Sequence, residues 1–313
     1  MSSSCHVCGQ AITTVWTTAT DIEYGTTAER FTYRLCERCD ALSIDPLPAD
    51  RLHEIYPPTY YSFASGDSPL DAERNLVTRV KARLDLRTFR RALSKVAEGP
   101  VRILDVGGGT GDIAARLVEA AGPSASAVVV DIDAESIELA RRRGLGGFVG
   151  RFEDFASEER FDVILMLNLI EHVADPAGML ARARELLSPG GIVWLQTPNF
   201  RSLDASLFRR RGWAGLHCPR HWVVFSDEGL RRALATAGLE PLELRRTQAG
   251  AFWAASLVAL TGAGRARPDG ELPRPVIAHP AFMPLAALGA GFDMVTGPLR
   301  GRTSQVTVFA RGV

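Results

Sequence analysis

Residues 104–111 read Leu-Asp-Val-Gly-Gly-Gly-Thr-Gly and join a short apolar run, residues 101–104, to a helix-like segment, residues 112–120. This order predicts a strand, a glycine turn and a helix. The glycines open backbone conformations that other residues avoid, and they let a ligand lie directly on the main chain. The helix that follows offers unpaired N–H groups to a carboxylate or a phosphate. The turn therefore predicts a ligand site on an α/β fold.

The spacing of the glycines excludes the dinucleotide fingerprint, G-x-G-x-x-G. Counted from Gly107, the last glycine of that pattern is replaced by Asp112. The segment instead has an acid, Asp105, two residues before the first glycine, followed by G-x-G-x-G. It resembles the cofactor loop of class I S-adenosylmethionine (SAM) methyltransferases. The resemblance implies that Asp105 helps to hold the cationic methionine ammonium of SAM, and that Gly107, Gly109 and Gly111 form the loop around it.

Three later segments extend this resemblance to roughly residues 100–247. The apolar run at residues 127–130 ends in Asp131, where the next strand of such a fold brings a carboxylate to the ribose hydroxyls. A buried-strand run at 161–167 leads into Asn-Leu-Ile-Glu-His-Val, and residues 187–191 read Leu-Ser-Pro-Gly-Gly. Together they look like a block shared by SAM-dependent methyltransferases related to the ubiquinone-type enzymes. We therefore expect an α/β fold with a Rossmann-like class I methyltransferase sheet. We also expect Ile132 and Asn168 to lie beside Asp131 at the cofactor.

The cysteines form two close pairs near the N-terminus, and a fifth, Cys218, stands far away. Two C-x-x-C pairs can surround Zn²⁺ in a closed, tetrahedral structural site. The alternatives are two disulfides or two redox motifs. We favour an N-terminal zinc ribbon with four cysteine ligands, whose metal supplies folding energy, a module that similar bacterial methyltransferases also carry. Its expected ligands are Cys5, Cys8, Cys36 and Cys39.

The rest of the chain predicts a three-part organisation. We expect a zinc-binding module at residues 1–45, a helical linker or cap at 46–99 and the methyltransferase domain at 100–313. The cap contains an amphipathic stretch, residues 71–96, and two candidate pocket residues, Tyr60 and Tyr61. Within the last part, substrate-binding inserts are expected at about 200–225 and 248–302. The apolar second insert predicts a packed helical pair or a homodimer interface, with a substrate lid or a membrane-surface contact as the alternative.

Two histidines are candidates for catalysis. Methyl transfer to a hydroxyl needs a base, and histidine is the natural base near neutral pH. We expect His221, in the first insert, to be that base, with His172 second because it follows the fourth strand at its carboxyl end. A metal-assisted mechanism is disfavoured because Asn168 stands where related metal-dependent enzymes place a glutamate. The alternative is a weaker metal site formed by Glu171, His172 and either His217 or His221. Arg220 replaces a glutamate that is typical of zinc-bearing sugar C-methyltransferases, which disfavours a C-methylation mechanism of that kind.

The charge composition of the chain argues against a nucleic-acid partner. The 313-residue chain carries 36 basic and 36 acidic residues, so nothing favours a nucleic-acid partner. The N-terminal residues lack the features of a signal peptide, so we expect a cytoplasmic protein. The expected function is O-methylation of a small-molecule acceptor, such as a natural product, a sugar or a lipid-linked hydroxyl, in a biosynthetic role. The alternatives are C-methylation of an activated ketosugar and a non-catalytic SAM-binding partner protein.

Overall fold

The computed structural model describes residues 3–57, 60, 86–265 and 271–313. Its largest element is a seven-stranded sheet with strand order β12-β13-β10-β9-β6-β7-β8. The strands from β8 to β10 run parallel, and β13 and β12 add an antiparallel edge. This confirms the predicted Rossmann-like methyltransferase sheet. The strands are β6 (Arg102–Val106), β7 (Ser126–Asp131), β8 (Gly146–Val149), β9 (Phe161–Leu167), β10 (Leu187–Pro198), β12 (Leu239–Thr247) and β13 (Gln305–Gly312).

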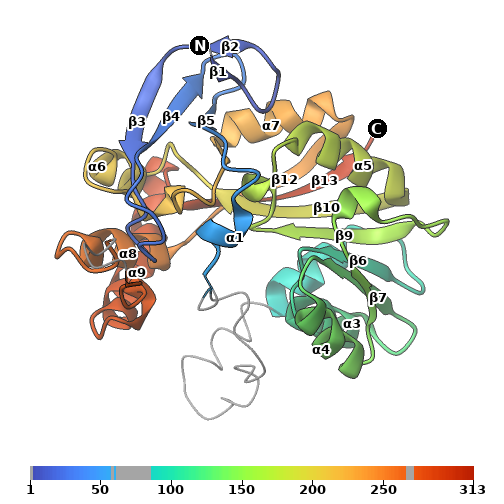
Figure 1. Ribbon diagram of the computed structural model, residues 1–313. Coiled ribbons are helices and arrows are strands. Elements are labelled where there is room, and N and C mark those ends of the chain that lie inside the picture. The colour runs from blue at the N-terminus through green and yellow to red at the C-terminus, as the bar shows by residue number, and fades with distance from the viewer. Residues whose placement is uncertain (1–2, 58–59, 61–85, 266–270) are drawn as a thin grey trace.

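Helices cover both faces of the large sheet (Figure 1). On one face lie α3 and α4, and on the other lie α5 and α7. Three of these helices begin at a side-chain cap: Asp133, Asp175 and Ser226 each accept a hydrogen bond from a backbone N–H in the first turn. The buried faces then meet the apolar strands. The bounds are α3 (Asp112–Ala121), α4 (Ala134–Arg142), α5 (Pro176–Leu186) and α7 (Asp227–Thr236).

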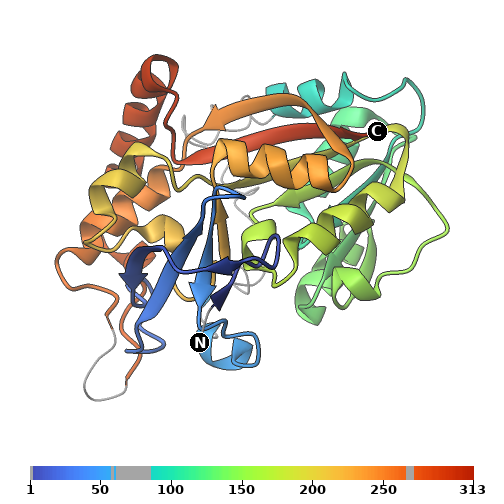
Figure 2. The same ribbon diagram turned by 90° about the horizontal axis from the view of Figure 1, so that it is seen from above.

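A smaller sheet joins the N-terminal segment to the first insert. Its strand order is β11-β5-β4-β3, and β11 (Val223–Phe225) pairs antiparallel with β5 (Ala41–Asp45). Figure 2 shows the N-terminal strands, in blue, next to the orange helix α7. The contact is direct, since Ser226 donates a hydrogen bond to Asp40 at 2.5 Å. The remaining N-terminal strands are β1 (Ser3–Ser4), β2 (Ala11–Ile12), β3 (Val15–Ala19) and β4 (Phe31–Cys36).

The second insert forms two helices, α8 (Gly250–Ala259) and α9 (Phe282–Arg300), which lie side by side at one end of the molecule (Figures 1 and 2). Glycine permits this close packing, because a Cβ at Gly250 would lie 2.0 Å from the Ala286 carbonyl oxygen. The outer face of α9 leaves Met283, Leu288 and Val295 about 70% exposed (69%, 70% and 69%). No helix in the described part of the chain is long and apolar enough to cross a membrane. Whether α9 meets a second copy or a membrane surface stays a prediction.

Short elements complete the fold around the inserts. Of the expected cap at residues 46–99, the structure describes α1 (Leu52–Ile55) and a helical segment over residues 86–93. Tyr61 and most of the amphipathic stretch, up to residue 85, lie outside the described residues. The three-part division of the chain stays a prediction. The other short elements are η2 (Phe152–Asp154), η3 (Ile170–His172), α6 (Leu203–Phe208), η4 (Ala214–Leu216) and η5 (Val276–Ala278).

A buried ion pair joins the N-terminal segment to the first insert. Arg220 Nη2 lies 2.6 Å from Asp21 Oδ2, and both side chains are fully buried (0% exposed). Burial alone raises the pKa of Asp21, but the guanidinium and the hydrogen bonds from Tyr24 and Thr26 outweigh it and lower that pKa. Arg220 Nε also donates to the Ile55 carbonyl at 2.7 Å. One arginine thus connects the β3–β4 connection, the α1 segment and the first insert.

Replacing Arg220 with methionine is expected to lower the free energy of unfolding by about 3–5 kcal/mol, because Asp21 is left as an uncompensated buried charge. The double variant Asp21→Asn/Arg220→Met should recover part of this loss, since it buries no unpaired charge. Urea unfolding of both variants measures the effect. If the free energy of unfolding of Arg220→Met lay within about 1 kcal/mol of that of the parent protein, the stabilising role of the ion pair would be contradicted.

Candidate functional site

The glycine turn follows β6 and is held open in a left-handed conformation. Gly107, Gly109 and Gly111 have φ angles of 66°, 53° and 73°, which disfavour residues with a side chain. Gly107 is also needed for packing, because a Cβ there would lie 2.8 Å from Leu169 Cδ1. Leu169 follows the end of β9, so this contact joins the cofactor loop to the segment that carries Asn168 and Glu171.

Asp105 lies beneath this turn with an unsatisfied oxygen. The residue is 3% exposed, and its Oδ2 atom has no hydrogen-bond partner among the described residues. Burial, together with the nearby Asp131 charge, raises the pKa of Asp105 to about 7. A buried carboxyl group that is costly to ionise gains from a cation placed beside it. The turn is therefore suited to a positively charged ligand.

Asp131, at the end of β7, borders the same turn. Its Oδ2 atom accepts a hydrogen bond from Gly109 N at 2.8 Å, and its Oδ1 atom accepts one from Asp133 N at 3.0 Å. The next residue, Ile132, is 61% exposed although it lies at the ligand edge of the sheet. An exposed isoleucine at this place offers an apolar surface to a ring. Asp105, the glycine turn, Asp131 and Ile132 thus lie together at this edge of the sheet.

A cavity of about 400 Å³ lies between the end of β9 and the two inserts. The sheet side contributes Asn168, whose Oδ1 atom accepts a hydrogen bond from Gln305 Nε2 at 2.8 Å. The first insert contributes His217 and His221, and α8, η5 and the start of α9 supply an apolar wall. Asn168 lines the cavity, and the next residue, Leu169, packs against the glycine turn, so this segment links the cavity to the cofactor loop.

His221 and Glu171 form a pair in this cavity. His221 Nδ1 lies 2.9 Å from the Gly215 carbonyl oxygen, so Nδ1 carries the proton and Nε2 keeps its lone pair. The Nε2 atom lies 4.0 Å from Glu171 Oε1. Burial and then His172 and His217 hold the pKa of His221 well below its usual range, while burial raises the pKa of Glu171 to about 8. The imidazole is therefore neutral and has a lone pair to accept a proton.

His172 has different surroundings. Its Nδ1 atom lies 3.0 Å from the Tyr56 hydroxyl and 3.1 Å from the Arg220 carbonyl oxygen. Burial and the neighbouring His217 lower the pKa of His172 to about 3. Glu171, His172 and His221 each place a ligand atom within 4.8 Å of the others. Asn168, which stands where related metal-dependent enzymes place a glutamate, is an amide bonded to Gln305.

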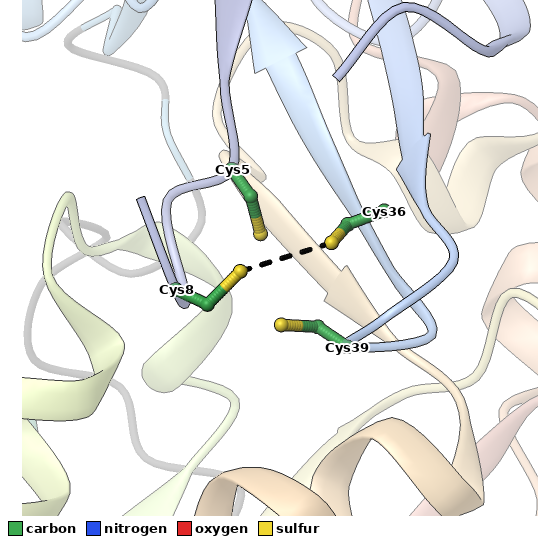
Figure 3. Close-up of side chains that lie close together, drawn as sticks. All are labelled: Cys5, Cys8, Cys36 and Cys39. Atoms are coloured by element: carbon green, nitrogen blue, oxygen red, sulfur yellow. Dashed lines mark hydrogen bonds between the residues drawn. The ribbon is translucent and has the colours of Figure 1, made fainter. Parts of the chain in front are cut away.

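The four N-terminal cysteines converge from two turns (Figure 3). Their sulfur atoms lie within 4.8 Å of one another, and Cys8 Sγ is 3.9 Å from Cys36 Sγ. All five cysteines of the chain are free, so neither C-x-x-C pair is a disulfide. A Zn–S distance of about 2.3 Å corresponds to a sulfur–sulfur edge of about 3.8 Å in a tetrahedron. The cluster has the size and the donors of a closed metal site.

The sequence points to only one of the two acidic residues of the cavity. It offers Glu171 as a ligand of the disfavoured metal site, and it gives no signal for Glu23. The lining includes both, and Glu23 Oε1 lies 2.7 Å from His217 Nδ1. Glu23 lies in a threonine-rich connection of the N-terminal segment without any spacing pattern around it. Only the position of the β3–β4 connection in three dimensions reveals it.

Comparisons with known proteins identify the family of the chain. A family model described as a methyltransferase domain matches residues 78–244. The ubiquinone biosynthesis O-methyltransferase of Bordetella avium (strain 197N) is 29% identical over 159 residues, which are 46% of this chain and 64% of that protein. The enzyme of the same name from Chelativorans sp. (strain BNC1) is 33% identical over 161 residues, 47% of this chain and 61% of that protein. These alignments span less than two thirds of the length of either relative.

A solved structure, that of the (4+2)-cyclase SpnF, superposes with a TM-score of 0.50 at 19% sequence identity and covers 76% of this chain and 83% of that chain. This likeness shows the fold alone. The family model spans more than half of the 313 residues, and it covers the glycine turn, Asp131 and the segment after β9. The chain belongs to the methyltransferase-domain family of class I SAM-dependent methyltransferases.

Proposed function

We propose that the protein transfers the methyl group of SAM to a hydroxyl group of a small-molecule acceptor, a natural product, a sugar or a lipid-linked compound, with His221 as the general base. One observation carries this proposal. His221, whose Nδ1–H is bonded to a backbone carbonyl, lines a cavity of about 400 Å³ that adjoins the cofactor loop. The methyl group of SAM and the hydroxyl group of the acceptor can therefore meet at the boundary between the glycine turn and the cavity.

The residues of the turn fit SAM. Asp105 offers a buried, unsatisfied carboxyl oxygen to the positive methionine end, and Asp131 offers a carboxylate to the ribose. Ile132 offers an exposed apolar surface to the adenine ring. When bound, the cofactor supplies an electrophilic methyl group on a sulfonium. The chain's own contribution is to hold that end of the ligand with Asp105 and to keep the acceptor in the adjoining cavity.

Binding of SAM is expected to strengthen as the pH rises from 6 to 8. The Asp105 carboxyl, with a pKa of about 7 in the free protein, must lose its proton to pair with a cation. Below that pKa the dissociation constant should rise by up to about tenfold per pH unit. Calorimetry in buffers of different ionisation enthalpy measures the released proton.

The variant Asp105→Asn should bind SAM more weakly and lose this part of the pH dependence. The exposed residue Asp154 serves as a control, because Asp154→Asn removes one charge elsewhere. An unchanged pH profile in Asp105→Asn would rule out the proposed role.

Proton removal from the acceptor needs a base that is free of its proton beforehand. His221 satisfies this condition because burial and the neighbouring histidines keep the imidazole neutral. The imidazolium formed during the reaction is stabilised when Glu171, 4.0 Å from Nε2, is a carboxylate. Thr197 holds Glu171 in place by donating a hydrogen bond to Oε2 at 3.0 Å. His172, with Nδ1 beside Tyr56 and Arg220, is the weaker candidate for the base.

Turnover is expected to rise with pH through about 8, as Glu171 ionises. His221→Ala should lower kcat by about 10²–10⁴-fold and leave SAM affinity intact. Glu171→Gln should lower kcat and remove the rise of kcat with pH near pH 8. His53→Ala, at a histidine with a 79% exposed side chain, serves as the control. Release of S-adenosylhomocysteine with a turned-over acceptor is the readout. Full turnover by His221→Ala would eliminate this mechanism.

We also propose that the four N-terminal cysteines hold one structural Zn²⁺. The support is their donor set and their mutual distances, together with the turn at Cys39, which packs on α7 through Asp40. Four thiolate ligands leave no open position on zinc, so the site stabilises the module and takes no part in catalysis. The metal would thereby maintain the sheet that β5 shares with β11.

The double variant Cys36→Ser/Cys39→Ser should lose its zinc and melt at least about 5 °C lower, because metal binding contributes folding free energy. Metal content per chain and the thermal midpoint are the measurements. Cys218→Ser is the matched control, since Cys218 lies outside the cluster and its loss should leave one zinc per chain. A parent protein that binds no zinc, or a double variant that retains it, would refute the site.

A further inference from the structure

Glu23 is fixed from three sides although it lies in a connection between strands. Its backbone N–H donates to Asp21 Oδ1 at 3.1 Å, and its carbonyl accepts a hydrogen bond from Val276 N, in η5, at 3.0 Å. Its side-chain Oε1 atom lies 2.7 Å from His217 Nδ1. The connection, the second insert and the first insert each hold one group of the same residue. These three hydrogen bonds hold the Glu23 carboxylate at one place in the cavity.

His217 takes a strained conformation to meet Glu23. It adopts a left-handed backbone conformation, with φ and ψ both 39°, which a residue with a side chain rarely takes. Strain of this kind persists where the surrounding structure requires it, and it is frequent at ligand sites. Here the strained turn directs the imidazole toward a carboxylate that lines the cavity. The backbone at His217 and the side chain of Glu23 are therefore parts of one arrangement.

The carboxylate residues that line the cavity are not balanced by lysine or arginine in the described part of the lining. The lining contains two acidic residues, Glu23 and Glu171, and, in the described part of the chain, neither lysine nor arginine. Arg220 is nearby, but its guanidinium is fully buried against Asp21 and does not line the cavity. Glu171 Oε1 is a second pointer to a ligand, because it is buried, lines this cavity and has no hydrogen-bond partner among the described residues.

Aromatic side chains complete the surroundings of Glu23. Tyr24, Phe252 and Phe282 line the same cavity, from the β3–β4 connection, α8 and the start of α9. The Arg220 guanidinium already lies over the Tyr24 ring, with Cζ 4.6 Å from its centroid, so Phe252 and Phe282 are the rings offered to a ligand cation. Aromatic faces attract cations, and they do so more strongly where water is excluded. A carboxylate beside aromatic rings recognises an ammonium group better than a neutral group, and it disfavours an anion.

We propose that Glu23 anchors the acceptor by accepting a hydrogen bond from a donor group on it, best an ammonium group and next a hydroxyl. Acceptors that place a carboxylate or a phosphate in this cavity are rejected. The inference rests on the proposed function, because it assumes that the cavity receives the methyl acceptor. It adds a specificity residue supplied by the N-terminal segment and a class of acceptor, a cationic or hydroxyl-bearing molecule with an apolar body.

Three phenols of nearly equal size test this inference: tyramine, 4-(2-hydroxyethyl)phenol and 4-hydroxyphenylacetate. They differ in one group, which is an ammonium, a hydroxyl or a carboxylate. Calorimetry on the full chain first measures binding of S-adenosylhomocysteine, and then binding of each phenol to the complex. Tyramine is expected to bind tightest, and 4-hydroxyphenylacetate at least about tenfold more weakly.

Glu23→Gln should abolish the preference for tyramine over 4-hydroxyphenylacetate without changing S-adenosylhomocysteine affinity. Glu23→Asp, which keeps the charge, should retain part of the preference and covers the case in which the glutamine variant fails to fold. Glu240→Gln is the matched control, because Glu240 is exposed and lies outside the cavity lining.

The outcomes separate the two proposals. If S-adenosylhomocysteine does not bind to the parent, the proposed function fails and this inference fails with it. If S-adenosylhomocysteine binds but the phenols bind equally, bind not at all or favour the carboxylate, only the role of Glu23 is overturned. A preference that survives Glu23→Gln and Glu23→Asp unchanged overturns it as well.

Discussion

The buried pair of Asp21 and Arg220 is the contact on which the proposed acceptor cavity depends. Asp21 sets the β3–β4 connection that carries Glu23, and Arg220 belongs to the segment that carries the two cavity histidines, His217 and His221, and leads into the strand β11. The pair has no exposed surface, so either charge without the other would be strongly destabilising. This constraint makes the N-terminal segment a structural part of the cavity, although the sequence places almost 200 residues between the two partners.

The two halves of the site are built in different ways. The cofactor half uses parallel strands and the turns that directly follow them, so Asp105, the glycine turn and Asp131 come together through local order and the strand order of the sheet. The acceptor half is assembled from the N-terminal connection, the segment after β9 and both inserts. Its geometry depends on pairing between distant segments, above all β5 with β11. A cofactor site of a common type can thus adjoin an acceptor cavity that is assembled from distant parts of this chain.

This difference explains what the sequence could predict. The glycine spacing, the acid after the second strand and the paired cysteines each have a local pattern, and the predicted Rossmann-like sheet is confirmed. Asn168 was expected at the cofactor, and the structure places it in the cavity lining with Gln305 as its partner. In the sequence, Arg220 is only a departure from a family pattern, whereas the structure shows its ion pair with Asp21. Glu23 has no local signal, because its role depends on contacts with residues about 190 and 250 positions away.

Amide hydrogen exchange with and without the proposed zinc ion measures whether the N-terminal segment and the proposed acceptor cavity form one structural unit. Removal of the metal is predicted to speed exchange in residues 3–45, and equally in the first insert at residues 214–225 and around η5, while residues 104–111 stay protected. Faster exchange confined to residues 3–45 would contradict this, because it would mean that the cysteine module is a separate domain that leaves the cavity unchanged.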